Sequence, residues 1–329
     1  MTGENIEISS NQPLHNATRV KEIRINHPRV IQVAAAVKSM IYPGSQDSLV
    51  VVTGPSGVGK TSLSSFLVEE EVRNSKEALE ADAGTIPAIY IEADASGEKE
   101  FSWRLFYQRI LHALGSEIAV DTMEYGINPS TGLMLRPKGA SRNTLASLRT
   151  AVERALRARK TKFIVVDEAA HIINQCRSSQ MLTQFDALKS LANRCGSQII
   201  LVGAYDLHKL VSLSAQLSRR TYVVHFERYR RDNAEDWRAF QSTVRAFEKK
   251  FPQLWGDNLM PYVEDLYANS LGCIGTLSGI LTRAANIHSD KQHWKETLQN
   301  ALYTHAQVNR MLEEIKEGEL EINPSLCRG

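Results

Sequence analysis

Short apolar runs alternate with longer segments of helical periodicity over the first two thirds of this chain. The apolar runs cover residues 49–52, 88–93, 163–166, 198–202 and 222–226. Between them, apolar residues recur at the three- and four-residue spacing of one helix face, over 101–114, 143–159 and 180–194. Strands that alternate with helices pair in parallel and are covered by helices on both faces. The pattern predicts an α/β domain built on a parallel sheet.

Three segments depart from this alternation. Residues 1–18 are polar and aperiodic, so we expect a flexible N-terminal arm. Residues 28–40 carry valines at helical spacing ahead of the first apolar run, which predicts a lead-in helix. The stretch 116–140 is irregular and contains glycine and proline; because long connections of this kind are usually functional or disordered, we treat it as an insertion.

After Arg228 the strand patterns stop and only helical patterns follow, up to residue 317. The sequence therefore predicts an α/β domain over 19–228, an all-helical domain over 229–318 and a short tail over 319–329. A length of 329 residues suits two domains.

The composition excludes some classes of site and location but does not indicate a function. A net charge of +2 neither requires nor excludes a nucleic-acid partner, because a local basic surface is compatible with a nearly balanced total. The 4 cysteines include no CxxC pair, so neither a zinc site nor a disulfide framework is indicated. No apolar stretch is long enough to cross a bilayer, and the N-terminus has no signal-peptide pattern. We expect a cytoplasmic protein with reduced thiols and no membrane partner.

A complete phosphate-binding loop, GPSGVGKT, lies between the first apolar run and a helical segment. Its glycines let main-chain N–H groups close around a phosphate, Lys60 reaches the β- and γ-phosphates, and the Thr61 hydroxyl binds Mg²⁺. A helix that starts at the loop adds N–H groups of its own. We expect ATP and Mg²⁺ as cofactors, held by Gly54, Pro55, Ser56, Gly57, Val58, Gly59, Lys60, Thr61 and Ser62.

Two acidic residues, Asp167 and Glu168, follow the apolar run 163–166. In a nucleotide hydrolase the first acid at this place holds Mg²⁺, and the second positions the attacking water or acts as its general base. We assign Asp167 to the cofactor and metal, and Glu168 to catalysis. Solvated charges at a strand end are the alternative, which the upstream phosphate loop disfavours.

The run 198–202 ends in Gly203, Ala204, Tyr205 and Asp206, where a polar side chain commonly senses the γ-phosphate. Ala204 stands where a threonine or asparagine is expected. Two interpretations stay open: Tyr205 or Asp206 takes this role, or the segment is a turn in which Asp206 caps a helix.

Arg219 and Arg220 precede the last predicted strand and are the candidate arginine finger. An arginine at a helix end can reach the γ-phosphate held by a neighbouring subunit and neutralise charge in the transition state. A basic pair at a helix C-terminus is the structural alternative. The sequence does not distinguish between the two arginines.

Together these motifs resemble those of AAA+ ATPases, and the extra helix over 101–114 is similar to that of the initiator-type branch. Within that branch the chain resembles the TnsC/TniB family of DNA transposition regulators. Four segments carry the resemblance: 26–30, reading NHPRV; 165–171, reading VVDEAAH; 200–203, reading ILVG; and 272–277, reading GCIGTL.

The resemblance implies an AAA+ α/β domain with a helical lid and a bacterial, cytoplasmic ATPase. It also implies a homo-oligomer, as a ring or helical filament on double-stranded DNA, that links a target-selection protein of the TniQ or TnsD kind to a transposase and disassembles on hydrolysis. Gly275 stands where AAA+ lids often carry a sensor arginine, although Arg283 lies two turns further on. With Ala204, this departure favours slow hydrolysis that partners stimulate.

Candidate DNA contacts flank the extra helix and the insertion: Lys99, Arg104, Lys138, Arg142 and Arg149. Lysine and arginine contacts to phosphates would give salt-dependent, sequence-tolerant binding. Solvated surface charge is the alternative for each. Two other functions remain: a replication initiator or helicase loader, whose usual helix-turn-helix domain after the lid we do not expect here, and an ATP-switched signalling scaffold without DNA.

Overall fold

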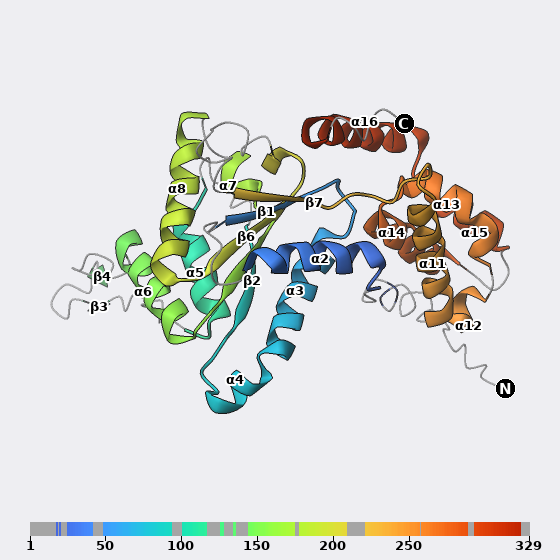
Figure 1. Ribbon diagram of the computed structural model, residues 1–329. Coiled ribbons are helices and arrows are strands. Elements are labelled where there is room, and N and C mark those ends of the chain that lie inside the picture. Colours follow the sequence, from blue (N-terminus) through green and yellow to red (C-terminus); the bar gives the residue numbers. More distant parts are fainter. Residues whose placement is uncertain are drawn as a thin grey trace.

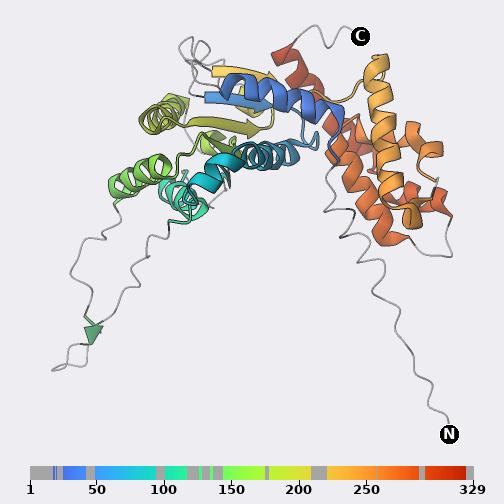
Figure 2. The same ribbon diagram turned by 60° about the horizontal axis from the view of Figure 1, so that its bottom comes forward.

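The computed structural model describes residues 18, 20, 25–41, 49–93, 101–116, 126–127, 134–135, 144–174, 178–208, 221–256, 258–288 and 293–323. An α/β part contains the sheet, and helices α11 (Ala234–Lys250) to α15 (Trp294–Ala301) gather at one side of it (Figures 1 and 2). This confirms the predicted α/β architecture with a helical C-terminal region.

The central sheet has five parallel strands in the order β2-β5-β6-β1-β7. Their bounds are β1 Leu49–Thr53, β2 Ala88–Glu92, β5 Phe163–Asp167, β6 Gln198–Gly203 and β7 Thr221–His225. Parallel strands run the same way, so the residues that follow β1, β5, β6 and β7 meet at one edge of the sheet. The insertion contributes a separate two-stranded pair, β3 Gly126–Ile127 and β4 Met134–Leu135.

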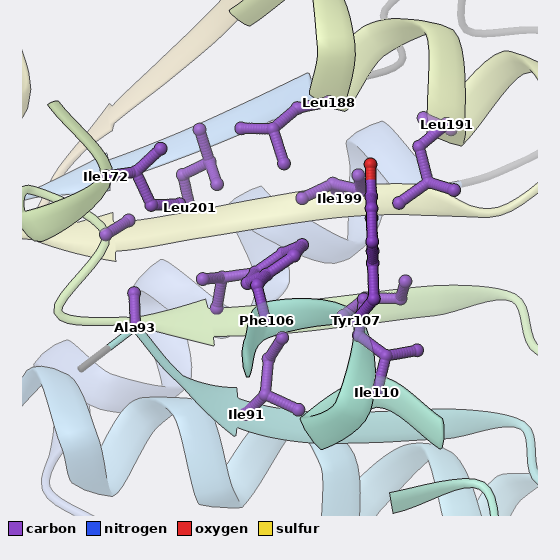
Figure 3. Close-up of a cluster of buried hydrophobic side chains, with 14 of the residues drawn as sticks. Ile91, Ala93, Phe106, Tyr107, Ile110, Ile172, Leu188, Leu191, Ile199 and Leu201 are labelled. Carbon is purple, nitrogen blue, oxygen red and sulfur yellow. The ribbon is translucent and has the colours of Figure 1, made fainter. Parts of the chain in front are cut away.

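Helices cover both faces of the sheet, which explains why its inner strands are apolar throughout. One face packs on α5 Trp103–Ala113, α6 Leu145–Ala158 and α8 Ser178–Cys195. Figure 3 shows Phe106 and Ile110 of α5 in this cluster, together with Ile91 of β2 and Leu201 of β6. The other face packs on α2 Pro28–Ile41 and α3 Lys60–Asn74. Short helices α4 Lys76–Ala81 and α7 His171–Asn174 complete this part.

The helical C-terminal region, which we call the lid, has its own apolar core around Phe240, Trp255 and Leu277. Its helices are α11 Ala234–Lys250, α12 Pro252–Trp255, the 3-10 turn η1 Met260–Tyr262, α13 Val263–Ser270, α14 Ile274–Ile287, α15 Trp294–Ala301 and α16 His305–Ile322. No helix in the described part of the chain is both long and apolar enough to cross a membrane.

The last helix differs from the sequence-based expectation, because α16 continues through Ile322 into the stretch predicted as a tail. A glycine such as Gly318 often ends a helix. Here it lies inside α16, where an added Cβ would come within 2.1 Å of the Tyr205 ring. Gly318 thus allows close packing of α16 on the α/β part rather than ending the helix.

Candidate functional site

The phosphate loop connects β1 to α3 and depends on its glycines. Gly57 and Gly59 have φ angles of 76° and 116°, a region that other residues rarely adopt. A Cβ on Gly54 would lie 2.4 Å from the carbonyl oxygen of Phe226, so the loop also needs a close backbone approach there. Because α3 begins at Lys60, the first N–H groups of this helix lie at the loop, as an anion site requires.

Lys60 is buried at this loop. Its Nζ donates to the carbonyl oxygens of Gly54, at 3.0 Å, and of Pro55, at 2.9 Å. Burial lowers the pKa of the Lys60 ammonium, and the carboxylates of Glu168 and Asp167 oppose this effect. Because β1 and β5 are parallel strands that both pair with β6, the loop lysine and both predicted acidic residues lie at the same edge of the sheet.

Asp167 ends β5 with its carboxylate oriented by two donors. Its Oδ1 accepts the backbone N–H of Glu168 at 2.9 Å, and its Oδ2 accepts the hydroxyl of Tyr90 at 3.4 Å. Burial raises the pKa of Tyr90 to about 12, with the Asp167 charge adding to the shift, so the phenol stays protonated and can donate. Tyr90 lies in the middle of β2, and its sequence neighbours give no sign of this contact.

Glu168 has an unusual backbone conformation. Its φ is 50°, which costs a non-glycine residue about 1 to 3 kcal/mol and persists where the surroundings enforce it. The enforcing contact is on the next residue, because the N–H of Ala169 donates to the carbonyl oxygen of Val202 on β6 at 2.9 Å. The Glu168 side chain is exposed, whereas Asp167 is buried. Strain held at a single exposed acid is typical of functional sites.

The donor set fits Mg²⁺ as a cofactor. The Thr61 hydroxyl and the Asp167 carboxylate offer oxygen ligands, the type that Mg²⁺ prefers. Among the described residues, no group of three or more His, Cys, Asp or Glu side chains could hold a metal by itself. One hydroxyl and one carboxylate are enough for Mg²⁺, because this ion usually keeps several water ligands and also binds the phosphates of the substrate.

In the segment after β6, Tyr205 packs inside the protein. Tyr205 is buried, and its hydroxyl contacts Nε2 of His225 on β7 at 3.1 Å. Burial lowers the pKa of His225 to about 4, so this ring is neutral near pH 7. Asp206 is exposed in the first turn of a short helical segment. These contacts favour the turn interpretation for Tyr205.

The lid touches the phosphate loop directly. At the start of α14, the N–H of Thr276 donates to the carbonyl oxygen of Gly57 at 2.9 Å. A Cβ on Gly275 would lie only 2.6 Å from the same oxygen. Glycine at this place therefore permits backbone contact where a sensor arginine would not fit. Arg283 instead lies over the Tyr303 ring, 3.9 Å from its centroid.

Hydrogen bonds join the lead-in segment to Tyr229, which lies in the connection between the α/β part and the lid. The Tyr229 hydroxyl accepts the N–H of Arg29 at 3.0 Å and shares a second hydrogen bond with Nδ1 of His27, 2.8 Å away. Burial lowers the pKa of His27 to about 4. Arg29 also pairs with Asp236 at the start of α11, at 2.6 Å. Sequence reasoning did not find this network, although His27 and Arg29 belong to the NHPRV segment and Tyr229 lies in the basic run 228–231.

The structure describes only some of the remaining predicted site residues. Arg219, Arg220, Lys99, Lys138 and Arg142 lie outside the described residues. Arg104 is exposed on α5. Arg149 binds Glu153 at 3.1 Å and the Ser190 hydroxyl on α8 at 2.8 Å, so its charge is used to join α6 and α8.

Comparisons with known proteins agree with this geometry. A family described as an AAA domain matches residues 43–211. Among solved structures, a Walker-type ATPase of Pyrococcus abyssi is 17% identical, with 91% of this chain and 79% of that chain covered and a TM-score of 0.50. At this identity the similarity concerns the fold.

Two further structures resemble the chain more loosely. The ORC2 protein of Aeropyrum pernix, in ADPNP–ADP complexes, is 13% identical, with 90% and 71% of the two chains covered and a TM-score of 0.49. Domain III of the replication initiation protein DnaA of Thermotoga maritima is 14% identical, with 90% and 95% covered and a TM-score of 0.43. A search of the curated proteins found no significant match.

Proposed function

This chain belongs to the AAA-domain family, and we propose that it binds and hydrolyses ATP with Mg²⁺. The observation that carries the proposal is the strained Glu168, exposed beside a complete phosphate loop and next to the oriented Asp167. A simple nucleotide-binding module needs the loop but has no use for an acid held at this conformational cost.

In the proposed reaction, the loop N–H groups and the Lys60 ammonium hold the β- and γ-phosphates. Lys60 exchanges its bonds to the Gly54 and Pro55 carbonyls for phosphate oxygens. Thr61 and Asp167 would hold Mg²⁺, which neutralises charge on the phosphates. Glu168 accepts a proton from water as the water oxygen bonds to the γ-phosphorus, and the bond from that phosphorus to the ADP oxygen breaks.

Hydrolysis by the isolated protein is expected to be slow. Ala204 offers no side-chain donor after β6, and Gly275 leaves no room for an arginine at the lid contact. Both changes remove groups that would stabilise γ-phosphate charge. In the proposed scheme Arg219 or Arg220 of a neighbouring subunit supplies this charge, so turnover rises on assembly.

For the biological role, we infer a regulator of DNA transposition that assembles on target DNA with ATP and is released by hydrolysis. The support is sequence resemblance to the TnsC/TniB family. Two of the resembling segments take part in the lid junction, since His27 bonds to Tyr229 and Thr276 bonds to Gly57. A transposase and a target-selection protein of the TniQ or TnsD kind are the proposed partners.

Electron microscopy with duplex DNA tests this role. The protein with a non-hydrolysable ATP analogue should form rings or filaments on DNA, and Lys60→Ala should not. Absence of DNA-dependent assembly at low salt would contradict the transposition role and favour the scaffold alternative. A replication initiator or helicase loader would also assemble on DNA, so addition of transposase, with stimulation of hydrolysis, separates that alternative.

A further inference from the structure

Helix α16, the last helix of the lid, contacts the sheet edge that carries the phosphate loop (Figure 1). Residues on adjacent turns meet the segments that follow three strands. Glu314 meets Ser56 after β1, Gly318 meets Tyr205 after β6, and Glu319 meets Arg228 after β7. One helix thus touches the nucleotide edge at three places.

An ion pair of Glu319 and the burial of Ile315 anchor the helix. Glu319 is 3% exposed and takes both branches of the Arg228 guanidinium, with Nε to Oε1 at 2.8 Å and Nη2 to Oε2 at 3.4 Å. Paired hydrogen bonds of this kind fix geometry as well as charge. Ile315, one turn earlier, is buried in the apolar cluster on the α2 and α3 face of the sheet. These contacts hold α16 in place without help from Glu314.

Glu314 differs from Ile315 and Glu319 because it is exposed. Its Oε1 accepts the Ser56 hydroxyl at 3.3 Å, within the phosphate loop. It also lines a small pocket with Ser56, Thr276 and Met311, where the loop, the start of α14 and α16 come together. The negative charge of Glu314 raises the pKa of Lys60, as do the charges of Asp167 and Glu168. Hydrolysis assigns roles to Asp167 and Glu168 but none to Glu314.

Resting on the proposed ATPase function, we propose that Glu314 determines nucleotide preference by opposing negative charge at the phosphate loop. The anchored helix delivers a third carboxylate to a site that must accept a polyphosphate anion. Repulsion grows with the charge of the ligand, so this residue disfavours ATP more than ADP while α16 is docked. Strong ATP binding then requires the Glu314 carboxylate to turn away from Ser56.

The test is Glu314→Gln, which keeps the shape and removes the charge. Glu313→Gln is the matched control, because Glu313 is an exposed acid on the same helix that pairs only weakly with Arg310, at 3.3 Å. Affinities for fluorescent ATP and ADP analogues are measured at low and high salt. We expect Glu314→Gln to tighten ATP binding by about three- to tenfold at low salt, ADP binding by less, and Glu313→Gln to change neither.

The salt dependence separates charge from packing. Added salt should shrink the difference between Glu314→Gln and the wild type, since the side chain is exposed. Equal effects on ATP and ADP, no effect, or weaker ATP binding would overturn the proposal. If the wild type and Lys60→Ala bind ATP equally, the proposed ATPase site itself is wrong. Lys60-dependent binding that Glu314→Gln leaves unchanged refutes only the role of Glu314.

Discussion

The backbone N–H of Thr276 donates to the carbonyl oxygen of Gly57, so the lid and the phosphate loop share a hydrogen bond of 2.9 Å. Lid position and loop conformation are therefore coupled through main-chain atoms. Nothing larger than glycine fits beside this bond at residue 275.

Gly275→Ala should separate the lid from the loop, because the added Cβ would approach the Gly57 oxygen to 2.6 Å. We expect a loss of about 1 to 3 kcal/mol in unfolding free energy and weaker ATP binding. Gly279→Ala on the same helix is the control, since its Cβ would meet only the Tyr303 hydroxyl at 3.6 Å. That variant should be as stable as the wild type or slightly more stable. Equal thermal unfolding of both variants would contradict the coupling.

Tyr90→Phe should raise the Mg²⁺ concentration needed for tight nucleotide binding. The change removes the donor to Oδ2 of Asp167 and leaves the ring in place. Because the bond is long, we expect a shift of several-fold, below the roughly tenfold or greater effect of stronger outer contacts. Binding of a fluorescent ATP analogue is titrated with Mg²⁺. Tyr205→Phe, whose hydroxyl contacts His225 instead, should leave the Mg²⁺ requirement unchanged.

Much of the site could be predicted because its chemistry lies in consecutive residues. The loop 54–61 and the Asp167–Glu168 pair are local patterns, and the apolar runs place them at one sheet edge. Contacts between distant segments were not predictable in this way. Ser56 and Glu314 are 258 residues apart, and Tyr90 and Asp167 are 77 apart, so only the fold brings them together. The strain at Glu168 depends likewise on β6, through the bond from Ala169 to Val202.

Acid should destabilise the protein through His27 and His225. Burial lowers the pKa of both rings to about 4, below the unfolded value of 6.5. Between these pH values the unfolded chain binds more protons than the folded one, so stability is present above pH 6.5 and falls as the pH drops toward 4. Chemical denaturation at pH 7 and 4.5 measures the loss.

His27→Gln should make this loss smaller, although it also lowers stability at pH 7 by removing the ring nitrogen that is hydrogen-bonded to Tyr229. His293→Gln is the control, because His293 is exposed just before α15. An unchanged pH dependence in His27→Gln would show that His27 is not one of the groups responsible.

Glu168→Gly should relieve the strained backbone while removing the proposed catalytic base. Glycine adopts a φ of 50° without steric cost, so the variant should gain up to about 1 kcal/mol or lose little, and it should not hydrolyse ATP. Thermal unfolding and phosphate release report the two effects. A large destabilisation would mean that the Glu168 side chain supports the fold rather than the reaction.

Phosphate release from ATP with Mg²⁺, compared between the wild type and Glu168→Gln, addresses the proposed ATPase most directly. The isosteric change keeps size and removes the base. The wild type should release phosphate slowly and only with Mg²⁺, whereas Glu168→Gln should bind ATP with unchanged affinity and release almost none. The Lys60→Ala variant should not bind ATP. Release by Glu168→Gln at the wild-type rate would contradict the assignment of this site.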